Sequence, residues 1–266
     1  NGNITINNQL DFNKTLDDSY TTLASSQFNW NKKKTDNNTG FVFDNGANLR
    51  LVSISIDNKN TNDSDNIRFY PQLHTVISYP LIKAGSNFNQ TLSPKIMPII
   101  APYNNYTDAQ DISSSNLFSS NRATSTTQWE SGPRVNYGFD WFIDNINDFN
   151  LKLTVGQSFR INKNNSDNAE ELSDYYFSSN INMKNNYMNN SIVLDRKDID
   201  IKSISMNTYS EIYDLKLKVD YDYTSGKYSS TNEQVAVGGE YNFKNNFFLK
   251  FTGTKDIDTN KNIGYQ

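Results

Sequence analysis

The stretch RVNYGFDWFID, residues 134–144, alternates between apolar and polar side chains along almost its whole length. One parity is apolar and consists of Val135, Tyr137, Phe139, Trp141 and Ile143. The other parity is largely polar and consists of Arg134, Asn136, Gly138, Asp140 and Asp144, with Phe142 as the exception. Successive side chains of a β-strand point to opposite faces, so the stretch predicts a strand with one apolar and one polar face. In water the apolar face must be covered.

The same period-two pattern recurs along the chain, and no helical period competes with it. Clear examples are FNLKLTVGQSFRI at 149–161 and YDLKLKVDYDY at 213–223. We predict about 14 strands, an estimate from the pattern alone, at 2–12, 18–30, 39–44, 48–57, 67–82, 88–102, 133–143, 149–161, 174–184, 187–195, 199–208, 211–223, 234–243 and 247–256. The predicted fold is therefore an all-β antiparallel meander.

Composition excludes several classes of protein. The 266 residues are 35% hydrophobic with a mean hydropathy of −0.73, and the chain contains no apolar run long enough for a transmembrane helix. The 13% aromatic content is too high for a disordered chain. A net charge of −4 gives no basic surface for nucleic acid, and we interpret Lys32–Lys34 as a solvated loop.

Residues for catalysis or metal binding are scarce. The chain has no cysteine and one histidine, His74, which therefore lacks partners for a zinc or nucleophilic site. Adjacent carboxylates fall in predicted turns or loops, where they do not converge on a substrate. In DIDTNKNIG, residues 256–264, Lys261 replaces the glycine that a calcium loop requires, so a polar hairpin turn is favoured. We predict no enzyme activity, cofactor or metal.

The predicted connections alternate in length. Long polar ones lie at 31–38, 58–66, 103–132, 162–173 and 224–233, and short ones at 13–17, 45–47, 83–87, 144–148, 185–186, 209–210 and 244–246, while 196–198 breaks the rule. Tight turns at one end and long loops at the other are typical of outer-membrane barrels, whose strands alternate between lipid and lumen. A soluble sandwich or lipocalin-like barrel is the alternative, but such folds have no reason to sort their loops.

Three prolines recur at period four in LSPKIMPIIAP, residues 92–102, namely Pro94, Pro98 and Pro102. Each removes a backbone donor on one side of an otherwise strand-like segment. The strand is therefore expected to pair weakly on one side or to be bulged, unless the strand itself is shorter than the pattern suggests.

Seven motifs follow one another as in the barrel domain of the lipopolysaccharide (LPS) assembly protein family LptD. They are YPQL at 70–73, QTLSP at 90–94, APY at 101–103, NLFSSNR at 116–122, ESGPRVNYG at 130–138, VGQSFR at 155–160 and LSDYY at 172–176. The resemblance covers residues 68–266, whereas 1–66 is similar only in its alternation. We expect residues 1–266 to be a partial barrel domain, truncated at both ends, which predicts an open curved sheet.

The resemblance implies a non-enzymatic translocon in the outer membrane of a Gram-negative bacterium, which inserts LPS into the outer leaflet. It also implies a plug lipoprotein (LptE-like), a periplasmic bridge protein (LptA-like) and outer-membrane lipid as partners, and no nucleic acid. A porin-like diffusion channel is the alternative. A porin predicts clustered lumen charges on adjacent strands, whereas the visible ones, Arg134, Arg160 and Lys218, are scattered.

Candidate structural or transport residues come from the proline run, the motifs and the opening stretch. They are Pro94, Pro98, Pro102, Leu117, Phe118, Asn121, Arg122, Trp129, Arg134, Asn136, Asp140, Gln157 and Arg160. The longest connection, 103–132, holds five of these residues, and a loop of this length is usually functional or disordered. We expect Leu117, Phe118 and Trp129 to anchor it inside the barrel mouth.

Overall fold

The computed structural model describes residues 2–14, 20–57, 64–103, 116–122, 129–145, 148–161, 171–227, 232–243 and 247–265. These residues form one 15-stranded antiparallel sheet in which neighbouring strands follow chain order, while β5 lies off this path and pairs with β6. The predicted all-β meander is confirmed. Within the described ranges, no helix is long and apolar enough to cross a membrane.

The strands differ in length from three to 16 residues. Their bounds are β1 Asn3–Lys14, β2 Tyr20–Thr35, β3 Val42–Asp57, β4 Ser64–Ser78, β5 Leu81–Lys83, β6 Phe88–Ile100, β7 Arg134–Asn145, β8 Phe149–Arg160, β9 Tyr175–Met183, β10 Asn186–Leu194, β11 Ile201–Ile212, β12 Leu215–Thr224, β13 Asn232–Phe243, β14 Phe247–Asp256 and β15 Lys261–Tyr265.

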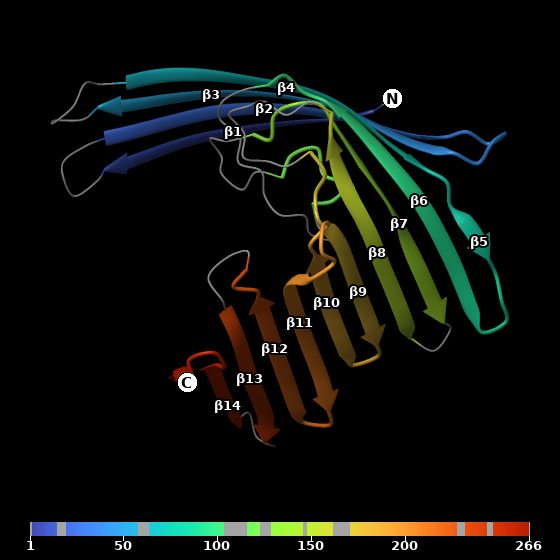
Figure 1. The fold of residues 1–266 in the computed structure, drawn as a ribbon, viewed down its shortest axis with the longest axis vertical. Helices are drawn as coiled ribbons and strands as arrows, with labels where there is room; N and C mark the ends of the chain where they lie inside the picture. The colour runs from blue at the N-terminus through green and yellow to red at the C-terminus, as the bar shows by residue number, and fades with distance from the viewer. Residues whose placement is uncertain are drawn as a thin grey trace.

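The sheet is strongly curved and open (Figure 1). β1 and β15 form its two edges, and among the described residues these strands do not pair with each other. This confirms the expected open curved sheet. The turn between β14 and β15 is a polar hairpin in which the Asp256 carboxylate accepts a hydrogen bond from the Thr259 amide at 2.8 Å, as DIDTNKNIG suggested.

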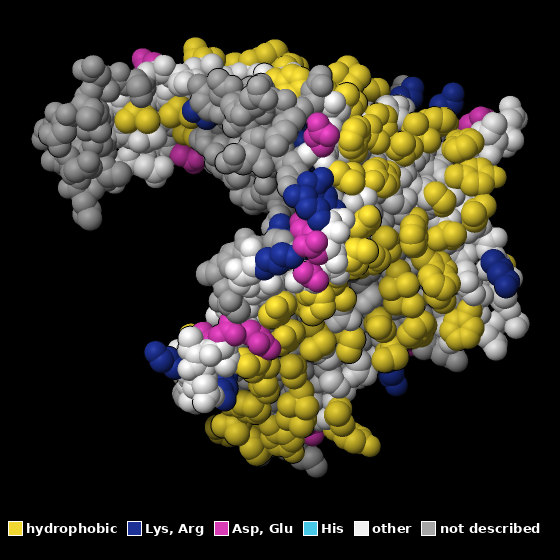
Figure 2. All heavy atoms as spheres, viewed as in Figure 1, with side chains coloured by type: hydrophobic (Ala, Val, Ile, Leu, Met, Phe, Trp, Pro, Cys, Tyr) yellow, Lys and Arg dark blue, Asp and Glu magenta, His cyan; other side chains and the backbone are white. Residues whose placement is uncertain are grey.

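The two faces of the sheet differ in polarity. Phe139 pairs with Val155, and Val155 with Phe177, so apolar residues of successive strands share one face. Figure 2 shows hydrophobic side chains gathered over the outer, convex side of the curve. Arg134 and Asn136 have the opposite parity and are fully buried on the concave side. The orientation predicted from residues 134–144 is confirmed.

From β6 onward the connections are sorted by length. The segments 146–148, 184–185, 213–214 and 244–246 join strands at one end of the sheet, and 101–133, 161–174, 195–200 and 225–231 join them at the other. The predicted asymmetry is confirmed for these strands. It does not extend to β1–β4, where 15–19, 36–41 and 58–63 are of similar length.

The predicted turn at 45–47 is wrong, because β3 runs through it without interruption. Gly46 pairs with Asn31 and His74, and a Cβ added there would lie 2.2 Å from His74 Cε1. The glycine therefore makes room for a neighbouring imidazole and does not mark a turn. Lys32–Lys34, expected in a loop, instead lie in β2 opposite this part of β3.

The strand that carries the prolines pairs unevenly with its neighbours. β6 pairs with β7 from Phe88 to Ile99, but its pairs with β4 are limited to Leu73–Ile100, His74–Ile99, Ile77–Ile96 and Ser78–Lys95. The Pro94 carbonyl accepts a hydrogen bond from the Tyr79 amide at 3.2 Å, so the donors missing at Pro94 and Pro98 face the β4 side. The expected one-sided weakness is confirmed, whereas Pro102 lies beyond the strand.

Candidate functional site

The described parts of the connection between β6 and β7, residues 116–122 and 129–133, lie on the concave side of the sheet (Figure 1). Leu117 is fully buried and packs against Tyr176 of β9, with Phe118 and Val193 beside them. A Cβ at Gly156 of β8 would lie 2.6 Å from the Leu117 side chain. Gly156 thus provides the space that Leu117 fills. Leu117 is therefore anchored on the concave side of the sheet, as predicted.

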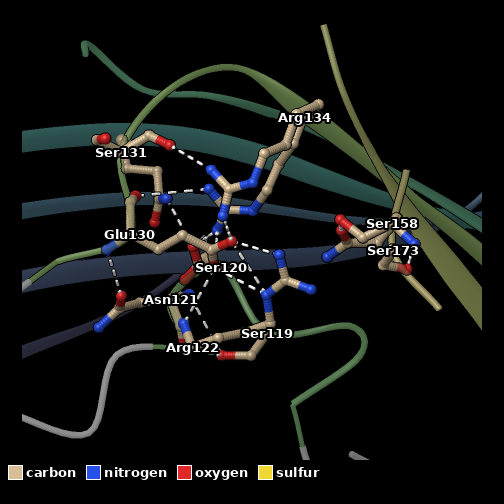
Figure 3. Close-up of polar contacts among 12 residues, drawn as sticks. Ser119, Ser120, Asn121, Arg122, Glu130, Ser131, Arg134, Ser158 and Ser173 are labelled. Atoms are coloured by element: carbon tan, nitrogen blue, oxygen red, sulfur yellow. Dashed lines mark hydrogen bonds and ion pairs between the residues drawn. The ribbon is translucent and has the colours of Figure 1, made fainter. Parts of the chain in front are cut away.

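At the centre of this loop one carboxylate meets three guanidinium groups (Figure 3). Glu130 is completely buried, with Arg160 Nη2 at 2.7 Å and Arg134 Nη2 at 3.0 Å from its oxygens. Arg122 donates to Glu130 through both Nε, at 2.9 Å from Oε2, and Nη2. We call Arg122, Glu130, Arg134 and Arg160 the arginine cluster.

The charge of the cluster keeps Glu130 ionised. Burial alone would raise the pKa of this carboxyl group, but Arg134, Arg122 and Arg160 outweigh burial and hold the pKa below its usual range. One carboxylate does not neutralise three guanidinium groups. Backbone carbonyls supply further acceptors: Arg134 donates to the Ser120 carbonyl, and Arg160 donates to the Ser131 carbonyl at 3.1 Å.

The expectation that Arg134 and Arg160 are scattered is wrong, because neighbouring strands bring these two arginines together. Arg134 begins β7 and Arg160 ends β8, and the two residues are partners in the antiparallel register. Their side chains therefore leave the sheet on the same face. The other two members come from the loop, where the Asn121 side chain accepts a hydrogen bond from the Glu130 amide at 2.9 Å and joins the ends of the described segments.

A second anchor lies over β3 and β4. Trp129 is 3% exposed and stacks on Tyr70 with ring centroids 6.1 Å apart, and the Arg50 guanidinium lies 5.7 Å from the Trp129 ring. Trp129 and Tyr70 share a hydrophobic cluster with Leu23 and Val52. Buried apolar clusters of this sheet thus form between its concave face and the loop.

A glycine allows the chain to pass from the loop into β7. Gly132 has a φ of 80°, and its amide donates to the Pro102 carbonyl at 3.0 Å. A Cβ there would lie 2.7 Å from the Tyr103 ring. The start and end of the connection, at Pro102 and Gly132, are therefore held side by side.

Other predicted site residues lie apart from the arginine cluster. Asp140 pairs with Lys95 at 2.5 Å, and Lys95 Nζ in turn lies 5.4 Å from the Phe118 ring. Gln157 has the convex parity and accepts a hydrogen bond from Tyr137 Oη at 2.7 Å. Pro94 and Pro98 lie at the boundary between β4 and β6. The predicted set therefore separates into several places.

Asn136 accepts a hydrogen bond from Ser158 Oγ at 2.7 Å and has no exposed surface. Although Asn136 has the lumen-facing parity, its burial beneath the loop means that Asn136→Arg is not expected to be tolerated.

Sequence reasoning missed the central member of the cluster. Glu130 opens the motif ESGPRVNYG. The sequence did contain a signal for it, because this acidic residue follows a tryptophan and lies four residues before an arginine. It also missed Gln72, whose side chain donates to the Ser120 carbonyl at 2.6 Å. Among the described residues, no group of three or more His, Cys, Asp or Glu could hold a metal ion.

Comparisons with known proteins give one family. The model described as "LptD: LPS transport system D" matches residues 55–247. A comparison with curated protein sequences gives no match. Two mutants of Rhodopseudomonas blastica porin align at 10% identity and TM-scores of 0.35, covering 95% and 97% of this chain and 94% and 96% of theirs. Likeness at that level does not bear on function.

Proposed function

The chain belongs to the LptD family of LPS transport proteins in the Gram-negative outer membrane, and from this premise we propose that residues 1–266 form part of a larger barrel. The apolar convex face suits contact with lipid, and the polar concave face suits a water-filled lumen for a charged head group. Unpaired backbone groups cannot face hydrocarbon, so β1 and β15 would pair with further strands of the same or another chain.

The transport step would be non-enzymatic. The single histidine lacks cysteine or histidine partners in the sequence, and the buried carboxylate is held by three arginines. The carboxylate and the three arginines position a loop. The energy for moving LPS would come from another component.

The observation that carries the proposal is the arginine cluster. It ties the connection between β6 and β7 to the concave face through Arg134 and Arg160, with Trp129 as a second anchor. A loop held in this way restricts free diffusion through the lumen. A translocon for a large lipid requires this restriction. We assign Leu117, Phe118, Asn121 and Arg122 to this closure.

We propose two protein partners, in keeping with membership of this family. A plug lipoprotein of the LptE kind would contact the part of the concave face that carries the Lys216–Glu240 pair on β12 and β13, where the Lys216 Nζ and Glu240 Oε1 atoms are 3.1 Å apart. A periplasmic bridge protein of the LptA kind would deliver LPS from the end of the sheet with short connections.

Deletion of residues 108–128 from the full-length protein in cells tests the closure. We expect higher uptake of large antibiotics with normal amounts of folded barrel, whereas deletion of 163–169 in the next long connection should leave uptake unchanged. Normal assembly with unchanged uptake would contradict the closure. Depletion of the whole protein should remove LPS from the cell surface, and a porin-like channel would instead leave surface LPS intact.

A further inference from the structure

A polar pocket of about 410 Å³ lies between the concave face of β2–β4 and the described part of the loop. The sheet contributes four amide side chains, one guanidinium and one imidazole, from Gln27, Asn29, Asn31, Asn48, Arg50 and His74. No carboxylate lines the pocket among the described residues. Amides offer both donors and acceptors, so the lining suits a ligand rich in hydroxyl groups and carrying negative charge.

Arg50 is the cation of this pocket. It is 8% exposed, and among the described residues it forms no ion pair. Its aromatic neighbours are Tyr70, its partner in the register of β3 and β4, and Trp129, whose ring lies 5.7 Å from the guanidinium group. Burying a guanidinium without a carboxylate is costly. Its planar fork of donors fits a carboxylate or phosphate, which would remove that cost.

Three residues around the pocket carry buried nitrogen atoms without a hydrogen-bond partner in the described structure. They are Arg50 Nε, His74 Nδ1 and Trp129 Nε1. Buried polar groups are almost always paired, and a buried indole N–H in particular usually finds an acceptor. Because these atoms have almost no accessible surface, a ligand in the pocket would reach Arg50 through the rest of its guanidinium group and not through Nε.

The pocket is also fixed in shape by the loop. Asn48 Nδ2 donates to Ser120 Oγ at 2.6 Å, and Gln72 Nε2 donates to the Ser120 carbonyl at 2.6 Å. Ser120 in turn contacts Arg134 of the arginine cluster. A loop that closes the lumen therefore also forms one wall of the pocket.

We propose that this pocket binds an anionic saccharide, a sugar acid or phosphorylated sugar, with Arg50 on the anionic group and the amides on the hydroxyl groups. The inference rests on the proposed function for its source, which would be the head group of LPS in transit. Binding beside this loop would hold the sugar at the place where the loop restricts the lumen.

Binding can be measured on the purified full-length protein in detergent, by saturation-transfer NMR and tryptophan fluorescence. The probes are glucose 6-phosphate, glucose, inorganic phosphate and the phosphorylated oligosaccharide obtained by deacylating LPS. We expect glucose 6-phosphate and the oligosaccharide to bind, and glucose and phosphate to bind at least roughly tenfold more weakly, since each lacks one half of the contacts.

Arg50→Gln should weaken binding of both charged sugars by roughly tenfold or more, because it removes the charge-assisted contact. Trp129→Phe, which removes the N–H together with the five-membered ring of the indole but keeps a six-membered aromatic ring, should weaken binding less. The matched control is Lys218→Gln, which removes a cation from β12, away from the pocket, and should bind normally.

Equal binding by Arg50→Gln and the parent protein, with both barrels folded, would overturn the pocket assignment. Equal binding of phosphate and glucose 6-phosphate would do so too, because it would show an anion site without sugar contacts. Either result can occur while depletion still removes surface LPS, so the pocket can fail without the proposed function failing.

Discussion

At the scale of single residues, Glu130 determines whether the loop can lie where it does. Its carboxylate is the acidic partner of Arg122, Arg134 and Arg160, which belong to the loop, to β7 and to β8. Without it, three like charges would remain in one buried place. A buried ion pair adds little net stability, but removing one partner is strongly destabilising.

Glu130→Gln is therefore expected to loosen the loop while leaving the strands in place. The glutamine amide has nearly the same shape as the carboxylate but no charge. The loss of stability should be about 3–5 kcal/mol, as for other buried ion pairs that lose one partner. Limited proteolysis of the full-length protein should cut within 101–133 at lower protease concentrations. Glu171→Gln is the matched control, since the Glu171 side chain is exposed. Identical cleavage of both variants would show that Glu130 does not hold the loop.

The residue scale also marks how far the sequence alone leads. Arg122, Arg134 and Arg160 could be selected from motifs, and the parity of Arg134 predicted its concave position. Their meeting could not be predicted, because it depends on the register that pairs Arg134 with Arg160 and on a loop that brings Glu130 back over both. Gln157 was selected from its motif as a structural or transport candidate, but motif membership does not give the face on which a residue lies, and Gln157 has the convex parity.

At the scale of elements, alternation predicts strands well and their interruptions poorly. Gly46 resembles a turn residue in sequence, yet it sits within β3 because His74 occupies the space beside it. The prolines, unlike Gly46, led to a correct prediction, because Pro94 and Pro98 indicated one-sided pairing in β6. A missing backbone donor has a local consequence, whereas the need for a glycine depends on a residue from another strand.

The boundary between β4 and β6 should be the least protected interior boundary of the sheet. Four residue pairs join these strands, whereas β7 and β8 are paired from Arg134 to Asp144. Amides without ladder partners exchange faster, because less local structure must open. In hydrogen–deuterium exchange of the detergent-solubilised protein, a peptide covering 71–78 should exchange faster than one covering 149–156. Equal protection of the two peptides would contradict an opening-prone boundary.

At the scale of the whole molecule, the curved sheet separates two environments. The connection between β6 and β7 fills part of the concave side, and hydrophobic side chains cover the convex side that Figure 2 shows. The large core of a soluble sandwich would need a second sheet, but the described strands all belong to one. Lipid is the cover that the opening stretch of sequence requires, in keeping with the family's place in the outer membrane.

Two phenylalanines of the same strand test this separation. Phe139 has the convex parity and pairs with Val155, whereas Phe142 has the concave parity and pairs with Lys152. Phe139→Arg in the full-length protein should cost about 2–4 kcal/mol if the residue lies near the middle of the bilayer, because the charge would enter hydrocarbon. Phe142→Arg should cost less, because its side chain is 39% exposed toward the lumen. Unfolding by denaturant in lipid vesicles measures both free energies. Equal costs, or a larger cost at Phe142, would mean that lipid does not contact the convex face.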